Sequence, residues 1–482
     1  MKKTIQCSLS LLIFAVACSG PDKSDLIIEN IRQEYIEGNF TRASMLRDSL
    51  LKVYPGSIKA NNEADSLIEI SLRIKDDFSL SHNQIIQQLR NIPGMTDDSK
   101  IKEWEDKKWL EFRMIDGEKR YFNRAASNLY LLKGFYEDKD NRAKTINEDP
   151  RMKARKQHSE EIIQQSGSSS LPVENVKMKI TYTLTVAADA VPAGETVRCW
   201  LPWPKGNHPR QSGPHLISVS EPEYLISDDS LVHRTLFMEK KAFGNQPTVF
   251  SISFNYSSSG QHFSFERIKA GNYDKSSELF REYTSEQPPQ INFNNAVKNL
   301  ADSITGPTDD PKTIVNKIYM WFKANIPWTG ALEYSTMADI PGYVIENRRG
   351  DCGMQTFLFM SMLRYKGVPV KWQSGWMVPP GAENLHDWCE VWFEGTGWVP
   401  VDVSYDLQDS GNKEVREFYL SGIDSYRMIV NDGISGELYP PKKYLRSEPF
   451  DFQRGEVEWS GSNLYFDKWD YEMEIEYLTG KN

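Results

Sequence analysis

The stretch that decides the fold is Gly350-Asp351-Cys352-Gly353, which leads into an apolar run that ends at Gly367. Apolar residues at helical spacing predict a helix over 354–366, and glycine is a common helix-ending residue. Asp351 is a suitable N-cap, which puts Cys352 in the first turn. The positive end of the helix dipole favours a thiolate there, so we expect a lowered pKa for Cys352. A backbone N–H of the same turn is available to stabilise an oxyanion.

A β-hairpin is predicted downstream, with strands over 386–393 and 398–403 and a turn over 394–397. Because side chains alternate along a strand, burial of the valine-rich face puts His386 and Asp402 together on the other face. This parity requires an odd number of loop residues or a bulge, since a one-residue slip separates the two side chains. Cys389 falls on the core face, and we interpret it as a packing residue.

A thiol, an imidazole and a carboxylate therefore follow one another along the chain. A cysteine nucleophile needs a base that takes its proton, and the base needs a third group that fixes its tautomer. Each of Cys352, His386 and Asp402 taken alone is more often structural than catalytic. Together, in this order, they predict a catalytic site. Asp406, four residues on and with the same parity, is a rival acid.

The segment from about Asn325 to Asp402 resembles the transglutaminase-like superfamily, the papain-related group that includes transglutaminases and bacterial cysteine peptidases. The resemblance covers roughly a sixth of the chain and implies that Cys352 is the nucleophile, His386 the general base and Asp402 the residue that orients it. It also implies an aromatic residue on the cleft wall near the thiol, for which Trp328 is the substrate-binding candidate. The motifs that carry it are Arg349-Gly350-Asp351-Cys352-Gly353, Leu363-Arg364-Tyr365-Lys366-Gly367-Val368-Pro369-Val370, His386-Asp387-Trp388-Cys389-Glu390-Val391 and Gly397-Trp398-Val399-Pro400-Val401-Asp402.

The chemistry expected of such a site is attack of the thiolate on a peptide or carboxamide carbonyl, giving a thioester. Water or an amine then takes the acyl group. We favour hydrolysis, because transfer to an amine demands an acceptor site that excludes water. An amine-transferring transglutaminase and a catalytically inactive, lipid-anchored binding or assembly protein are the alternatives. No cofactor is predicted, and no metal: the Cys and His residues lack zinc-site spacing, and residues 402–414 do not fit a calcium loop.

The N-terminus predicts export. Lys2 and Lys3 precede an apolar run over 9–17 that is too short to span a membrane, so residues 1–17 are predicted to be a signal peptide. Ala15-Val16-Ala17-Cys18 resembles a bacterial lipobox with alanine in place of leucine at its first position. Cys18 would then be lipidated and anchor the protein in the cell envelope, in the outer membrane rather than the inner. Ordinary secretion with cleavage near Ala17 is the alternative.

The net charge and the number of cysteines limit the classes of molecule that the chain is expected to bind. Loss of residues 1–17 removes two lysines, so the net charge of −10 becomes −10 − 2 = −12, which disfavours nucleic-acid binding. Besides Cys18, the mature chain keeps Cys199, Cys352 and Cys389, which is no disulfide framework. The expected partners are a protein or peptide substrate and, through the lipid anchor, a membrane.

The 482 residues suggest about three domains. The predicted fold class is multidomain: a helical N-terminal region, a β-sandwich, then an α+β papain/transglutaminase-like catalytic domain with C-terminal strands. Period-two alternation over 177–265 supports the sandwich. The predicted parts are a helical region over 18–140 with a winged-helix-like module, a linker over 141–172, the sandwich over 173–268, the catalytic domain over 290–425 and a C-terminal β extension over 426–482.

Overall fold

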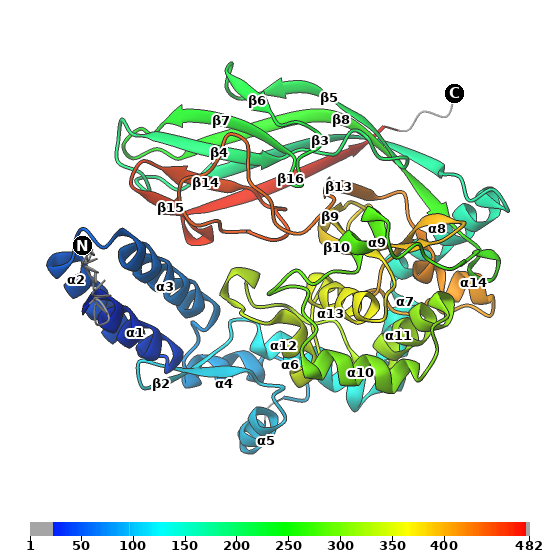
Figure 1. Cartoon of the computed structure of the whole chain (residues 1–482), viewed down its shortest axis with the longest axis horizontal. Coiled ribbons are helices and arrows are strands. Elements are labelled where there is room, and N and C mark those ends of the chain that lie inside the picture. Colours follow the sequence, from blue (N-terminus) through cyan, green and yellow to red (C-terminus); the bar gives the residue numbers. More distant parts are fainter. Residues whose placement is uncertain (1–22, 96, 479–482) are drawn as a thin grey trace, which may run out of the picture. The chain divides into compact units, whose positions relative to one another are not determined.

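The computed structural model describes residues 23–95 and 97–478 (Figure 1). The predicted signal peptide and Cys18 lie outside these residues. The described residues divide into two compact units: 23–78 with 113–120, and 79–95 with 97–112 and 121–478. All the predicted site residues between Trp328 and Asp402 belong to the second unit.

The first unit contains three amphipathic helices, α1 (Lys23–Ile36), α2 (Phe40–Val53) and α3 (Ile58–Asp77), whose apolar faces form one small core. Its hairpin turns at Asp116-Gly117, between β1 (Phe112–Ile115) and β2 (Glu118–Tyr121). The Asp116 carboxylate accepts hydrogen bonds from the backbone and hydroxyl of Thr41. The hairpin therefore groups with α1–α3, and not with the helices α4 (His82–Arg90) and α5 (Ile101–Asp106) that a winged-helix module would use.

The linker predicted over 141–172 is instead helical for most of its length. It forms α7 (Lys139–Glu148) and α8 (Pro150–Ser166). The Asp149 carboxylate caps α8 by accepting from the N–H of Arg151, and a proline at the first helical position is already in helical geometry. The charged residues of this stretch are good helix formers, and Ile162 is fully buried against Phe418 and Tyr419. The remaining helical elements before it are η1 (Asp98–Lys100) and α6 (Ala125–Tyr136).

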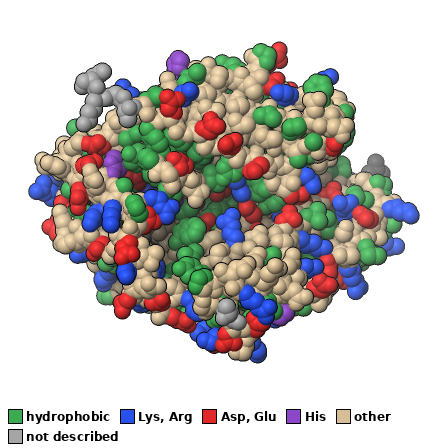
Figure 2. Space-filling view, turned by 180° about the vertical axis from the view of Figure 1, so that it is seen from behind, with side chains coloured by type: hydrophobic (Ala, Val, Ile, Leu, Met, Phe, Trp, Pro, Cys, Tyr) green, Lys and Arg blue, Asp and Glu red, His purple; other side chains and the backbone are tan. Residues whose placement is uncertain are grey.

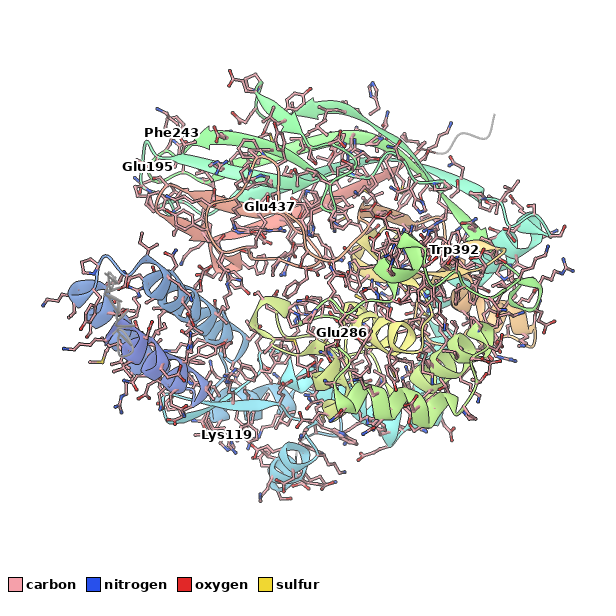
Figure 3. All side chains as sticks on the ribbon, viewed as in Figure 1. Lys119, Glu195, Phe243, Glu286, Trp392 and Glu437 are labelled. Atoms are coloured by element: carbon pink, nitrogen blue, oxygen red, sulfur yellow. The ribbon has the colours of Figure 1, made fainter. Side chains whose placement is uncertain are left out.

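Two antiparallel sheets of five strands share one hydrophobic core. Their strands lie in the upper part of Figure 3, where Glu195 and Phe243 mark loops at one end. One has the order β12-β8-β3-β16, with β5 on β8, and the other the order β15-β14-β4-β7-β6. Alternate residues point into the core, including Ile180, Tyr182 and Leu184 on one sheet and Cys199 and Leu201 on the other. The strands are β3 (Val173–Val186), β4 (Thr196–Pro202), β5 (Gln211–Val219), β6 (Tyr224–Ile226), β7 (Thr235–Lys241), β8 (Thr248–His262), β12 (Gly422–Ile423), β14 (Glu456–Trp459), β15 (Ser462–Leu464) and β16 (Trp469–Tyr477).

The C-terminal strands complete these sheets. β16 pairs with β3 along its whole length, from Trp469 opposite Val186 to Tyr477 opposite Met178, and β14 pairs with β4. The last part of the chain thus returns to strands far upstream, and on the way its residues 447–454 line a cavity in the second unit.

A third sheet, with the antiparallel order β11-β10-β9-β13, packs one face against α13 (Cys352–Tyr365). Glycine is needed at 375 on β9, because a Cβ there would lie 2.0 Å from the carbonyl oxygen of Met428 on β13. The strands of this third sheet are β9 (Val370–Met377), β10 (Asn384–Phe393), β11 (Gly397–Val401) and β13 (Arg427–Asn431). The surrounding helical elements are η2 (Phe265–Arg267), α9 (Glu278–Tyr283), α10 (Asn295–Thr305), α11 (Pro311–Asn325), η3 (Tyr334–Thr336), α12 (Ile340–Asn347), α14 (Lys413–Arg416), η4 (Phe418–Leu420) and η5 (Phe466–Lys468).

None of the described helices has the length and apolarity that crossing a membrane would require. On the face shown in Figure 2, acidic and basic side chains are interspersed, so the net negative charge of the chain is not gathered there into one patch.

Candidate active site

Cys352 occupies the first turn of α13, as predicted. The Asp351 carboxylate caps this helix by accepting from the N–H of Met354 at 2.9 Å, and it also accepts from the hydroxyl of Tyr334 at 2.6 Å. Cys352 is 8% exposed and lines a cavity of about 330 Å³. Only glycine fits at 353, because a Cβ there would lie 2.2 Å from the Tyr334 hydroxyl. The helix start is thus built to bring a small, nearly buried thiol to a cavity wall.

His386 and Asp402 form the pair that the hairpin parity predicts. The loop between β10 and β11 holds three residues, since Phe393 lies opposite Gly397, and the odd loop length is confirmed. Nε2 of His386 lies 2.7 Å from Oδ2 of Asp402, and both side chains are buried. The rival acid Asp406 instead forms an ion pair with Arg142.

The charge on Asp402 fixes the tautomer of His386. Burial raises the pKa of Asp402, but His386 and Arg427 lower it more, so the carboxyl is held far below its usual range and is ionised. A carboxylate can only accept, so Nε2 of His386 carries the hydrogen. Burial lowers the pKa of His386 against the opposing pull of Asp402, so the ring is neutral near pH 7. Nδ1 therefore carries a lone pair, and it makes no hydrogen bond within residues 23–95 and 97–478.

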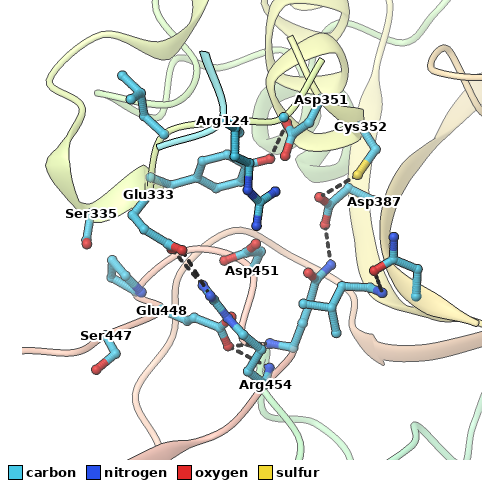
Figure 4. A pocket seen from close by; sticks show the side chains of 18 of the residues that line it. Arg124, Glu333, Ser335, Asp351, Cys352, Asp387, Ser447, Glu448, Asp451 and Arg454 are labelled. Carbon is cyan, nitrogen blue, oxygen red and sulfur yellow. Dashed lines mark hydrogen bonds and ion pairs between the residues drawn. The ribbon is translucent and has the colours of Figure 1, made fainter. Parts of the chain in front are cut away.

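The thiol has a different immediate partner from the one that catalysis requires. Sγ of Cys352 donates to Oδ2 of Asp387 at 3.4 Å (Figure 4). A hydrogen bond from the backbone of Asp387 also reaches the sulfur. The described residues show no hydrogen bond between the thiol and His386. Asp387 directly follows His386 on β10, and successive side chains of a strand point to opposite faces, so the thiol would have to turn from Asp387 to reach the imidazole.

The expected lowering of the thiol pKa is wrong for this structure. Burial raises the pKa of Cys352 well above its ordinary value, and the carboxyl groups of Asp387 and Asp351 raise it further. The backbone hydrogen bond from Asp387 opposes this rise without cancelling it. The sequence reasoning counted the helix N-terminus and missed the burial and the two acids, so the thiol is neutral in this arrangement.

Replacing Asp387 by asparagine is expected to move the pH profile of Cys352 alkylation to lower pH. The variant keeps the size of the side chain and removes a negative charge that disfavours the thiolate. The rate of carbamidomethylation of Cys352, followed by peptide mass spectrometry between pH 6 and 10, measures the shift. Asp309→Asn, the same change at an exposed position, should leave the profile in place. An unchanged profile in Asp387→Asn would contradict the assignment of Asp387 as the acid that holds the thiol neutral.

Other acidic side chains line the same cavity (Figure 4). Burial raises the pKa of Asp351 to about 6, although its bonds to Tyr334 and Met354 lower it. Burial, and then the neighbouring acids, raise the pKa values of Asp387 and Asp451 well above the usual range. Glu333 and Glu448 are both paired with Arg454.

Sequence reasoning missed the contribution of residues 447–454, which lie between β13 and β14. The backbone carbonyl of Asp451 accepts from Ser374 and Asn431, which attaches this segment to β9 and β13. The Gln453 amide donates to Oδ1 of Asp387 at 2.6 Å and to the carbonyl of His386 at 2.9 Å. No local pattern in the sequence signals these contacts, because the pairing of distant strands creates them.

The remaining predicted residues are Trp328, Cys389 and Cys18. Trp328 is half exposed and lines the cavity together with Cys352, where a substrate-side aromatic was expected. Cys389 lies in the core between α13 and the sheet, as the strand parity predicted. Cys18 lies outside the described residues. Among those residues, no group of three His, Cys, Asp or Glu side chains is arranged to hold a metal ion.

Residues 298–403 match the family model of the transglutaminase-like superfamily, so the chain contains a domain of that superfamily. No curated protein matches the chain. A structure described as a putative cysteine protease from Cytophaga hutchinsonii is 13% identical, with a TM-score of 0.44 over 65% of this chain and 94% of that one. The periplasmic domain of TgpA from Pseudomonas aeruginosa is 14% identical, with a TM-score of 0.25 over 50% and 90% of the two chains. These TM-scores are low, and the family match alone identifies the domain.

Proposed function

We propose that this transglutaminase-like domain is a cysteine hydrolase that cleaves peptide or amide bonds, with Cys352 as nucleophile, His386 as general base and Asp402 as the residue that orients the base. One observation carries the proposal. Ionised Asp402 holds the hydrogen on Nε2 of His386, which leaves the Nδ1 lone pair free on the strand against which the thiol lies. A neutral imidazole with its second nitrogen fixed by a carboxylate is the arrangement that general-base catalysis requires.

The reaction follows from these roles. Sγ forms a bond to the carbonyl carbon while its proton passes to Nδ1 of His386. The tetrahedral oxyanion forms near the first turn of α13, where the backbone N–H of Cys352 has no helical acceptor. Collapse of the intermediate breaks the C–N bond, and the proton on Nδ1 goes to the leaving amine. Water then attacks the thioester carbon and gives one proton to Nδ1 of His386. Collapse of this second intermediate breaks the C–S bond, and His386 returns the proton to the sulfur, which releases the acid and restores the thiol.

The neutral resting thiol fits this general-base route. A thiol whose pKa is raised by burial and by Asp387 does not form a lasting ion pair with His386. Its proton would instead leave as the C–S bond forms, after a substrate carbonyl has entered the cavity and the thiol has turned from Asp387 toward His386. Hydrolysis is favoured over amine transfer because charged side chains line the cavity and keep it accessible to water.

The first test compares alkylation of the three described cysteines by iodoacetamide near pH 8. Cys352 is expected to react much faster than Cys199 and Cys389, which are fully buried. His386→Ala should slow the labelling of Cys352 about tenfold or more, because the base that assists loss of the proton is gone. Equal rates in the two proteins would leave an inactive binding protein as the better description.

The same proteins then report the activity. Wild-type protein should cleave members of a peptide mixture that Cys352→Ala leaves intact. Adding a fluorescent primary amine distinguishes the two acyl acceptors, since incorporation of the amine in place of cleavage would identify a transglutaminase. Mass spectrometry of the N-terminal peptide reports whether Cys18 carries acyl chains, which is how we propose that the enzyme is held in the bacterial cell envelope. Failure of cleavage and of amine incorporation together would overturn the enzyme proposal.

A further inference from the structure

The cavity beside Cys352 contains a carboxylate with no partner. Asp451 is 9% exposed and lines this cavity, yet its side chain makes no hydrogen bond or ion pair with any residue in 23–95 or 97–478. In Figure 4 it lies between Glu333 and Asp387 without a dashed contact. Because Asp451 lines the cavity and bonds no described residue, its carboxylate is available to accept hydrogen bonds from an occupant of the cavity.

The side chains around Asp451 indicate the sign of the charge that such an occupant would carry. Arg454 forms ion pairs with Glu333 and Glu448, so these three side chains together carry one net negative charge. Asp351, Asp387 and Asp451 then remain, and Arg124 on the rim is the only described lining cation without an ion pair. When ionised, the acids outnumber the cations, and a positively charged group entering the cavity would find an excess of carboxylate.

We propose that Asp451 forms a subsite for a primary ammonium group of the substrate, next to the bond that Cys352 attacks. The inference rests on the proposed function, because it names the chemical class of substrate for the same thiol. A lysine-like side chain and a free N-terminus both carry this group. The ammonium would donate to Asp451, with Asp387 and Asp351 close enough to share its charge.

The raised pKa values of the acidic side chains that line the cavity agree with this assignment. Burial and repulsion between neighbouring acids raise the pKa values of Asp351, Asp387 and Asp451, so these carboxyl groups lose their protons less readily than exposed ones. A cation lets a carboxylate ionise by replacing the proton, which turns the repulsion within the cluster into attraction. Uncharged or anionic groups lack this compensation.

Charge-selective thiol reagents test the subsite without requiring turnover. The purified full chain is treated with aminoethyl, methyl and sulfonatoethyl methanethiosulfonate, which are cationic, neutral and anionic. In each, the thiol sulfur forms a disulfide and methanesulfinate leaves. Rates at Cys352, located by peptide mass spectrometry, are divided by the rates with a small free thiol. The cationic reagent is expected to exceed the neutral one about tenfold, and the anionic one to fall below it.

Asp451→Asn should remove most of this preference, measured as the ratio of the cationic to the neutral rate at Cys352. The variant is expected to fold, because the Asp451 side chain has no described hydrogen bond to lose and its backbone contacts remain. Asp309→Asn is the matched control and should keep the full preference. A charge preference no larger than that of the free thiol, or one that survives Asp451→Asn, overturns the subsite while leaving the catalytic roles of Cys352 and His386 intact. No labelling by any of the reagents overturns both.

Protection experiments distinguish the two sources of the ammonium. Labelling of Cys352 by the neutral reagent is measured in the presence of N-acetyl-lysine amide, which has only a side-chain ammonium, and of norleucine amide, which has only an α-ammonium. Protection by the first identifies a basic side chain, and protection by the second identifies a free N-terminus. N-acetyl-norleucine amide has neither, and protection by it as strong as by the charged compounds would contradict the proposal.

Discussion

Asp402→Asn is expected to lower peptide hydrolysis about 10⁴-fold, which is the usual cost of removing the acid that orients a catalytic histidine. The contacts explain why an amide cannot replace the carboxylate here. Oδ2 accepts from both His386 and Arg427, and Oδ1 accepts from the backbone and hydroxyl of Ser404. Because every partner is a donor, the NH₂ group of asparagine would face a donor whichever way it turned. His386 would lose the charge that stabilises its protonated form during catalysis.

Asp406→Asn is the matched control for this prediction. Asp406 lies four residues further on and is ion-paired with Arg142 at a partly exposed position, so its loss should change hydrolysis less than about twofold. Initial rates on a peptide cleaved by the wild-type protein measure both variants, and urea unfolding verifies that each is folded. If Asp406→Asn were the inactive variant and Asp402→Asn the active one, the assignment of the orienting acid would be reversed.

The parts of the site that the sequence predicted correctly depend on local periodicity. The helix with Asp351 as its cap and the hairpin with an odd loop both follow from patterns of less than 20 residues. Alternation along β10 then decides that His386, and not its neighbour, meets Asp402. Such inferences need no knowledge of how distant segments pack, because one buried face fixes the other.

The features of the site that the sequence did not predict depend on the pairing of distant strands or on the electrostatic effects of burial. Asp451 reaches the cavity only because β14 and β16 return to strands that lie far upstream. Arg427 was not recognised for the same reason, since nothing around it in the sequence points to Asp402. The direction of the Cys352 pKa shift was wrong because burial and two acids outweigh the helix N-terminus, and neither burial nor those contacts can be read from a short motif.

Arg427→Met is expected to destabilise the protein by about 3–5 kcal/mol, the usual cost of removing one partner from a buried ion pair. Arg427 is 1% exposed, and it donates to Asp402 at 2.9 Å and to Asp424 at 3.0 and 2.9 Å. Methionine fills similar space and supplies no charge, so two buried carboxylates would lose their cation. Urea unfolding followed by circular dichroism measures the change. Arg267→Met, at an exposed arginine with no described ion pair, should alter stability by less than about 0.5 kcal/mol.

The pH dependence of the stability difference distinguishes the loss of a buried ion pair from a simple loss of packing. In the wild-type protein the pKa of Asp424 is lowered: burial raises it, but Arg427 lowers it more, so this contribution to stability is present above the unfolded pKa and is lost as the pH falls. In Arg427→Met the same carboxyl is buried without its cation, so its folded pKa should exceed the unfolded value. The variant then binds more protons when folded, and its stability rises as the pH falls. The difference between the two proteins should therefore shrink between pH 7 and pH 4. A difference that stays constant over this range would show that methionine costs packing and that the buried charges are not what Arg427 stabilises.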